Sequence, residues 1–331
     1  MQHICAIDIG YSGLKIAAGA AGEPPHVLMR PSGAAPVGHV AEDIGLPGLA
    51  EPPVWVDVGG ARWAAAIDPS CYDGWQRSLH EDYVATGAYR ALAIAGMVLQ
   101  ARATGRREID MLVTGLPVSQ IGDAPRVQAV KRTLAGRHPH HEGNIVVRAV
   151  TVLAQPLGAY AEMVTSTRDE DVLARADEGT VLVIDPGFYS FDWALLARGQ
   201  LRQSASGTSL EAMSVALEQA ARAAAADHGG RPQPALLEAA ARAGRERVLQ
   251  NGTWIEVANY VQQGATKVVP TALEALRTAL RRESLTPDLV LLAGGGGVWF
   301  REPLCELFPK ARVLMSTDPA TANVRGFFVY A

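Results

Sequence analysis

Cysteine is scarce in this sequence. Its 331 residues include three cysteines, Cys5, Cys71 and Cys305, and no two of them have the spacing of a metal-binding or redox motif. The odd number argues against a disulfide framework, so a reducing cytoplasm is the expected compartment. The chain begins directly with a strand-like run, from which we expect no signal peptide.

A strong charge of one sign and long apolar runs are also missing. The net charge of −4 argues against a strongly basic surface for direct contact with nucleic acid. No apolar run approaches the roughly 20 residues that cross a bilayer, so we expect no membrane contact. Hydrophobic residues make up 48% and charged residues 19%, as in ordinary soluble proteins, and the length leaves room for two domains.

The most informative stretch is an apolar strand that ends in an acid and is followed by a glycine turn. Residues 4–15 read ICAIDIGYSGLK, which predicts a hairpin with Asp8 near its tip. Glycines allow the backbone N–H groups of such a turn to face an anion such as phosphate. An acid at this place can hold Mg²⁺ through water, although a single hairpin of this kind is as often a simple turn.

The same arrangement occurs again, which makes the pattern more specific. Residues 181–193 read VLVIDPGFYSFDW, so a second apolar strand ends in an acid, Asp185, before a glycine and a second strand. A third glycine turn, LLAGGGG at 291–297, follows a strand and precedes a helical stretch. Two such hairpins and a late glycine turn indicate two similar halves that bind one nucleotide between them.

The three blocks, in this order and spacing, resemble the phosphate-1, phosphate-2 and adenosine motifs of the superfamily of actin, heat-shock-chaperone ATPases and sugar kinases. Within it, the chain most resembles the bacterial actin-like plasmid-segregation ATPases of the ParM/StbA type. The block at 184–193 is similar to protein D of plasmid-borne PRTRC systems. The resemblance spans nearly the whole chain, and it is weak around residues 30–90 and 210–270.

This resemblance implies an α/β, actin-like ATPase fold, with two similar ribonuclease-H-like domains that flank a nucleotide cleft. Domain I would cover residues 1–170, with an inserted subdomain at about 30–85. Domain II would cover residues 178–331, with an inserted subdomain at about 208–270. Strands interleaved with helices agree with mixed sheets in α/β layers.

The resemblance also implies the ligands, ATP or ADP with Mg²⁺, and the residues that bind them. Asp8 and Asp185 would hold the hydrated Mg²⁺, and Lys15 would neutralise phosphate charge as a point cation. The nucleotide would lie on three turns: Gly10, Tyr11, Ser12, Gly13, Leu14 and Lys15 in the first, Gly187, Phe188, Tyr189 and Ser190 in the second, and Gly294, Gly295, Gly296 and Gly297 in the third. A side chain on the last four would clash with adenine or ribose.

Gln155 is the candidate for the attacking water. It ends an apolar run, and Pro156 follows where a helix would begin. In the family, the residue that orients this water lies here, a glutamine in actins and usually a glutamate in ParM-like proteins. A glutamine cannot act as a strong base, so we expect slow hydrolysis. The alternative is a polar residue that caps the helix.

The second turn departs from the glycine- and threonine-rich loop that is common in the superfamily. Pro186, Phe188 and Tyr189 are bulky, and we expect them to narrow the phosphate pocket. Asp192 is a lesser candidate for a metal or water contact, and a structural role is favoured for it.

Three functions remain open at this point. The first is an ATPase that polymerises head to tail into filaments and moves plasmid DNA through a DNA-binding adaptor, as the family implies. The second is a small-molecule kinase of the same fold, which needs a general base, usually aspartate, near the substrate hydroxyl, and Gln155 stands where that base would be expected. The third is a non-polymerising ATPase switch.

Several local predictions complete the sequence-based interpretation. Gly59-Gly60 and Asn251-Gly252 predict two-residue hairpin turns. Residues 166–179 should form an exposed connector, and residues 137–141 a solvated loop. A strand is expected at 201–206, a hydroxyl-capped helix start at 207–211, and another helix start at Asp318-Pro319.

Overall fold

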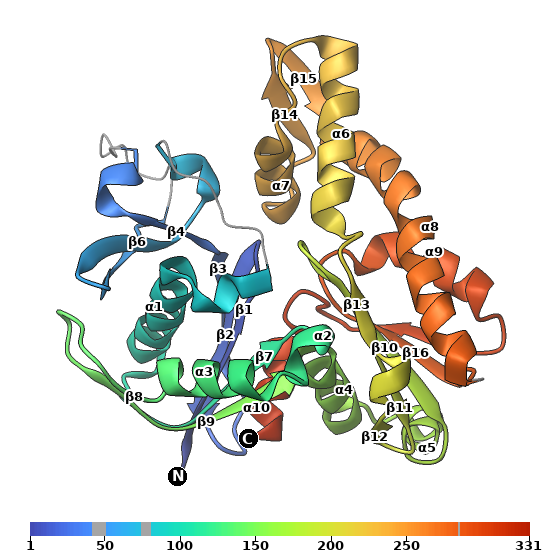
Figure 1. Ribbon diagram of the computed structural model, residues 1–331, viewed down its shortest axis with the longest axis horizontal. Helices are drawn as coiled ribbons and strands as arrows, with labels where there is room; N and C mark the ends of the chain where they lie inside the picture. Colours follow the sequence, from blue (N-terminus) through green and yellow to red (C-terminus); the bar gives the residue numbers. More distant parts are fainter. Residues whose placement is uncertain (42–50, 74–80, 284) are drawn as a thin grey trace. The chain divides into compact units, whose positions relative to one another are not determined.

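The computed structural model describes residues 1–41, 51–73, 81–283 and 285–331, which form two compact units (Figure 1). Unit 1 contains residues 1–116, 120–165 and 321–331, and unit 2 contains residues 117–119 and 166–320. The division expected from the sequence placed residues 321–331 in the second half, whereas in the structure they belong to unit 1. Parts of the insertion predicted at about 30–85, namely 42–50 and 74–80, lie outside the described residues.

Unit 1 is built on a mixed sheet in the order β3-β2-β1-β7-β9-β8 and on a smaller sheet in the order β4-β6-β5. The strands are β1 (His3–Ile9), β2 (Gly13–Ala20), β3 (His26–Pro31), β4 (Gly33–Pro36), β5 (Val54–Val58), β6 (Ala61–Ile67), β7 (Glu108–Leu116), β8 (Gly136–His138) and β9 (Ile145–Ala154). The helices are α1 (Gly87–Thr104), α3 (Ala124–Leu134), α4 (Gln155–Ser166) and α10 (Ala322–Tyr330), with short 3₁₀ turns at Val37–His39, Pro69–Cys71 and Glu81–Ala85. A short helix, α2 (Val118–Ile121), contains the sequence boundary between the units.

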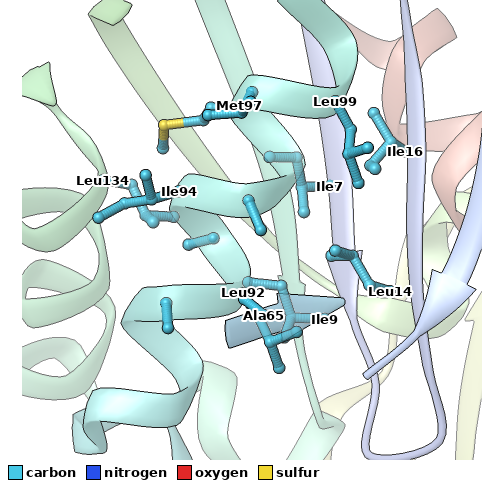
Figure 2. Packing of buried hydrophobic residues seen from close by; sticks show 14 of the residues in the cluster. Ile7, Ile9, Leu14, Ile16, Ala65, Leu92, Ile94, Met97, Leu99 and Leu134 are labelled. Atoms are coloured by element: carbon cyan, nitrogen blue, oxygen red, sulfur yellow. The ribbon is translucent and has the colours of Figure 1, made fainter. Parts of the chain in front are cut away.

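Strand β1, in the main sheet of unit 1, is buried along its whole length, and its alternate residues point to opposite faces of the sheet. Ile7 and Ile9 of β1 belong to the cluster that includes Leu92 of α1 (Figure 2). Ala6, on the opposite face, belongs to a second cluster with Phe327 of α10. Apolar residues on both faces of β1 therefore hold α1 on one side of the sheet and α10 on the other.

Unit 2 contains a sheet in the order β12-β11-β10-β16-β17, with β13 paired to β11, and a separate hairpin of β14 and β15. The strands are β10 (Thr180–Pro186), β11 (Phe191–Ala197), β12 (Gln200–Leu201), β13 (Gly207–Ser209), β14 (Arg247–Gln250), β15 (Thr253–Glu256), β16 (Leu289–Leu292) and β17 (Arg312–Met315). The helices are α5 (Glu170–Glu178), α6 (Met213–His228), α7 (Pro234–Arg242), α8 (Val257–Glu283) and α9 (Gly297–Leu307), with a 3₁₀ turn at Gln203–Ala205.

The two main sheets share one connectivity. In unit 1, β1 pairs antiparallel with β2 and parallel with β7, and β7 pairs parallel with β9. In unit 2, β10 pairs antiparallel with β11 and parallel with β16, and β16 pairs parallel with β17. The predicted mixed α/β fold with two similar halves is confirmed.

Both predicted two-residue hairpin turns are confirmed. Gly59 and Gly60 join β5 to β6 with φ of 61° and 80°. Asn251 and Gly252 join β14 to β15 with φ of 47° and 80°. Glycine and asparagine tolerate positive φ, which a type I′ turn requires at both central residues.

The prediction of an exposed connector at 166–179 is wrong about its conformation, because this segment contains helix α5. The Asp169 side chain caps this helix by accepting hydrogen bonds from the backbone N–H groups of Asp171 and Val172. Val172 and Ala176 are buried, so the charged stretch is an amphipathic helix with one apolar side. Most residues of this segment are charged or polar, so the two buried apolar positions were too few to indicate a helix from the sequence.

Other local predictions are also corrected. The strand expected at 201–206 ends at Leu201, and the segment at 207–209 is strand β13, so α6 begins later with Ala212 at its N-cap. The last helix begins at Ala322 and not at Asp318-Pro319. The supposed loop at 137–141 begins with β8, whose His138 is buried. In the part of the chain that the structure describes, no helix is both long and apolar enough to span a bilayer.

Candidate functional site

Three predicted residues of unit 1 lie together: two come from the first hairpin, and the third is distant in the sequence. Asp8 of β1 pairs in register with Lys15 of β2, and the Lys15 Nζ lies 2.8 Å from Asp8 Oδ2. Gln155 is the first residue of α4, and its Nε2 donates a hydrogen bond of 3.0 Å to Asp8 Oδ1. The parallel strands β1, β7 and β9 end at one edge of the sheet, which brings Asp8 and the start of α4 into contact.

The Asp8 carboxylate is buried, with 1% of the residue exposed. A buried charge requires a partner, and the Lys15 ammonium provides it. A carboxylate has about four lone-pair sites, so the two contacts with Lys15 and Gln155 leave capacity for water on a metal ion. Hard carboxylate oxygens suit Mg²⁺.

The Asp8 charge also acts on a neighbouring phenol. Burial raises the pKa of the Tyr89 hydroxyl, and the charge of Asp8 raises it further.

The turn after Asp8 is fixed by internal hydrogen bonds. The Gly10 N–H donates to the Gly13 carbonyl at 3.0 Å and closes the turn. Ser32 is 2% exposed; its hydroxyl donates to the Tyr11 carbonyl at 2.5 Å and its N–H to the Ser12 carbonyl at 3.3 Å. Sequence reasoning missed Ser32, because nothing in its local pattern shows that it reaches a turn twenty residues earlier.

Two side chains predicted to contact nucleotide are engaged within unit 1. Leu14 is fully buried in the core that packs on α1. The Tyr11 ring stacks on Tyr83, with ring centroids 4.4 Å apart. The backbone of this turn is therefore what these two positions offer to a ligand.

The second hairpin repeats the geometry of the first. Asp185 pairs in register with Asp192, as Asp8 pairs with Lys15, and the members of each pair are seven positions apart in the sequence. The Gly187 N–H donates to the Ser190 carbonyl at 2.9 Å. This bond joins the second and fifth residues after the acid, as the Gly10 bond does in unit 1.

Asp192 has a structural role, as the sequence favoured. Its Oδ1 accepts hydrogen bonds from the Val118 N–H at 3.0 Å and the Thr208 hydroxyl at 2.5 Å. Its Oδ2 accepts a bond of 2.6 Å from the Ser190 hydroxyl. Asp192 is 1% exposed, so these bonds satisfy a buried carboxylate and join β11 to β13 and α2. The Ser190 hydroxyl, predicted to face phosphate, is engaged here.

The second turn also caps helix α6. This helix has no side-chain cap, and its Met213 and Ser214 N–H groups donate to the carbonyls of Gly187 and Phe188, at 3.3 and 2.7 Å. The Phe188 side chain packs against the apolar cluster formed by α6, α7, β14, β15 and α8. Phe188 thus anchors the turn to α6, which gives its bulk a role other than the predicted narrowing of a pocket.

The glycine run lies against the second hairpin. A Cβ on Gly294, whose φ is 70°, would lie 2.3 Å from Asp185 Oδ1, and one on Gly296 would lie 2.7 Å from Met213 Cγ. Contacts within unit 2 thus require a residue without a side chain at these two positions, and the predicted closeness to adenine and ribose stays a prediction. A Cβ on Gly295 would meet no atom of the described residues within 4 Å, and Gly297 begins α9.

A further residue of the Asp8 cluster has no signal in the sequence. Gly115, near the end of β7, lies beneath Gln155 and beside Phe327 of α10. A Cβ there would lie 2.7 Å from Gln155 Cγ and 2.5 Å from Phe327 Cζ. Gly115 therefore provides the space that allows Gln155 to reach Asp8.

The chain is similar to known actin-like proteins in sequence over its first half and in structure over its whole length. Residues 6–158 match the family model "Actin like proteins N terminal domain". No curated protein matches the chain in sequence. Among solved structures, the chain is similar to the archaeal actin homolog Ta0583 in complex with ADP, at 16% identity and a TM-score of 0.71, over 98% of this chain and 97% of that chain.

Two bacterial structures are similar over comparable lengths. One is a 15-stranded ParM filament from Clostridium botulinum, at 15% identity and a TM-score of 0.73, covering 99% of this chain and 98% of that chain. The other is Bacillus thuringiensis ParM with AMPPNP, at 14% identity and a TM-score of 0.66, covering 99% and 98%. At these identities, the likeness establishes the fold.

Proposed function

We propose that this chain, which has the actin-like fold and an actin-like N-terminal domain over residues 6–158, is a slow Mg²⁺-dependent ATPase that assembles into filaments. The main support is the repeated hairpin, with Asp8 and Asp185 at equivalent places before turns of the same geometry. Further support comes from the similar proteins, one bound to ADP, one to AMPPNP and one in a filament.

In this proposal, both hairpins serve one nucleotide, as the family resemblance implies. Phosphoryl transfer to water needs placement and charge neutralisation more than covalent chemistry from the protein. Asp8 and Asp185 would hold Mg²⁺ through its waters, and the bound ion would neutralise phosphate charge. Lys15, which touches Asp8, adds a positive charge on the same hairpin.

Gln155 is assigned to orient the attacking water. Its Nε2 is engaged with Asp8, so its Oε1 is the atom that can accept a hydrogen bond from water. A fixed amide of this kind can position water but cannot remove its proton efficiently, which accounts for a slow reaction. The same bond makes the orientation of Gln155 depend on Asp8.

Replacing Gln155 by alanine should slow phosphate release from ATP by about tenfold or more, because a loss of about 1.4 kcal/mol of transition-state stabilisation already has this effect. Affinity for ATP should change by less than about threefold, since Gln155 is assigned to water and not to the nucleotide. Phosphate release and calorimetric ATP binding measure the two effects. Gln128→Ala, at an exposed position of α3, is the matched control. Equal rates of phosphate release in the wild type and in Gln155→Ala would show that Gln155 does not orient the attacking water.

An exposed apolar pair on unit 2 supports self-association. Leu249 of β14 and Trp254 of β15 are cross-strand partners, and they are 53% and 65% exposed. Large aromatic and aliphatic side chains side by side on an exposed hairpin are typical of contact surfaces, where a buried tryptophan contributes strongly to binding. We assign this pair to a contact with a second copy of the chain.

Nucleotide-dependent assembly tests the proposal directly. With Mg-ATP, 90° light scattering and pelleting should rise and then fall as phosphate appears, whereas AMPPNP should give a lasting signal. Replacing both Leu249 and Trp254 by serine should raise the concentration needed for assembly by about tenfold or more. Leu210→Ser, at a residue that is 50% exposed elsewhere on unit 2, should leave it nearly unchanged.

Two outcomes separate the parts of this proposal. ATP binding without scattering at any nucleotide would exclude filaments and favour the switch or the kinase. Normal assembly of the Leu249 and Trp254 double variant would place the contact elsewhere on the chain. The finer parts of the proposal are a cytoplasmic location and plasmid segregation through a DNA-binding adaptor, and they follow from the family resemblance alone.

A further inference from the structure

Three arginines of unit 1 surround a polar hollow that lies outside the hairpin clusters. Arg90 comes from the first turn of α1, Arg132 from the last turn of α3, and Arg137 from β8. The hollow has a volume of about 330 Å³. Its remaining lining residues are Ala129, Thr133, Ala135 and His138. The distant helix α1 and the consecutive elements α3 and β8 thus bring three arginines to one hollow.

No carboxylate balances these charges. The lining contains no aspartate or glutamate, and within the described residues none of the three arginines forms an ion pair. Other arginines of the chain, such as Arg102 and Arg312, do pair with carboxylates. Like charges around a hollow repel one another, which an anion in the hollow would reverse.

Helix electrostatics accounts for one of the three arginines. Arg132 lies at the C-terminal end of α3, where the helix dipole favours a cation. Arg90 lies in the first turn of α1, where the dipole disfavours a cation and where no acidic residue occurs. Arg137 is on a strand, so neither it nor Arg90 is explained by a helix end.

His138 contributes structure, not charge, to the hollow. It is buried, and its Nε2 bonds to the Leu134 carbonyl at the end of α3, at 2.9 Å. Burial lowers the pKa of His138, and the nearby Arg90 lowers it further. The groups left to bind a ligand are the arginines and the Thr133 hydroxyl.

We propose that this hollow binds a small ligand that carries a diphosphate or a similar oligophosphate group. Guanidinium forks match phosphate oxygens with two hydrogen bonds each, and the Thr133 hydroxyl adds a donor. The volume is at the small end of ligand sites, which suits a phosphate group and not a large apolar molecule. None of the predicted nucleotide-turn residues lines the hollow, so this proposal is independent of the nucleotide assignment.

Calorimetric titration of the full chain with pyrophosphate tests the site. The chain is first saturated with ADP, so that the nucleotide turns do not compete, at ~150 mM salt. We expect one saturable site, and Arg132→Gln with Arg137→Gln should weaken it by about tenfold or more for each arginine. The matched control replaces Arg231 and Arg245, two exposed arginines of unit 2 without ion pairs among the described residues, by glutamine. It should change affinity by less than about twofold, because it removes the same charge away from the hollow.

The possible results decide between clear alternatives. The absence of saturable pyrophosphate binding would overturn the proposal. Equal weakening by the control pair would also overturn it, because binding would then reflect net charge. Tighter binding of an acidic peptide such as hexaglutamate would assign the surface to a protein partner instead. Thermal unfolding of each variant verifies its fold, and Arg90→Gln provides a third, independent change. Pyrophosphate affinities of the wild type and the variants are compared at the same ADP concentration, so the differences between them can be interpreted whether or not ADP binds.

Discussion

Replacing Asp8 by asparagine is expected to lower Mg²⁺-dependent ATP hydrolysis by about 100-fold or more, the scale seen when a group that stabilises the transition-state charge is removed. A neutral amide cannot hold hydrated Mg²⁺ as a carboxylate does. The change also leaves Lys15 without the carboxylate that lies 2.8 Å from its Nζ. Gln155 would lose its anionic acceptor at the same time, so its amide would no longer be fixed in one orientation. One substitution thus removes the metal contact and disturbs both neighbours.

The comparison needs a control for charge and a control for folding. Asp57→Asn removes the same charge from an exposed position of β5 in the same unit, and it should leave hydrolysis unchanged. Phosphate release is measured across a range of Mg²⁺ concentrations, together with thermal unfolding of each variant. A folded Asp8→Asn protein that hydrolyses ATP with wild-type Mg²⁺ dependence would show that Asp8 serves the fold alone.

Local patterns carried most of what could be predicted from the sequence. The acid at the end of an apolar strand, followed by glycine, located Asp8 and Asp185 correctly on equivalent hairpins, because strand, turn and register depend on neighbouring residues. The Asn251-Gly252 turn was predictable for the same reason. The pairing of strands far apart followed from the family resemblance, not from these local patterns.

Contacts between residues far apart in the sequence could not be predicted from local patterns. Ser32 reaches back to the turn at residues 10–13, and Gly115 makes room for Gln155, but neither fact depends on its sequence neighbours. The packing of Phe188 could not be predicted for the same reason, since the elements of the apolar cluster that it contacts lie further along the chain. The hollow lined by arginines joins a helix start, a helix end and an edge strand, and no spacing in the sequence indicates that combination.

The second large effect is expected when Gly326 in α10 is replaced by alanine. We predict that this substitution lowers the free energy of unfolding of unit 1 by about 3 kcal/mol or more. A Cβ at this position would lie 1.6 Å from the Gly158 carbonyl oxygen of α4. In return, a Cβ on Gly158 would lie 2.3 Å from the Asn323 carbonyl oxygen. The obstructing atoms belong to backbone, so a side-chain rotation cannot relieve the clash.

The clash cannot be relieved by a small movement of α10 either. Asn323 accepts a hydrogen bond from the Ala159 N–H of α4, and Arg325 makes an ion pair with Glu162 of α4 at 3.0 Å. Phe327 of α10 also belongs to the buried cluster of the main sheet. Separating α4 from α10 by more than an ångström would disrupt these contacts together, which explains why the expected cost exceeds that of a typical substitution.

Urea unfolding of Gly326→Ala measures the loss, and Gly122→Ala is the matched control, because a Cβ on Gly122 would meet no described atom within 4 Å. The control should stay within about 0.5 kcal/mol of the wild type. A Gly326→Ala protein of nearly wild-type stability would mean that α4 and α10 do not cross at these glycines. Since α4 begins with Gln155, a displaced α4 should also weaken the contact with Asp8. Gly326→Ala should therefore slow hydrolysis even at temperatures where the variant is folded, which links the packing of the C-terminal helix to the proposed chemistry.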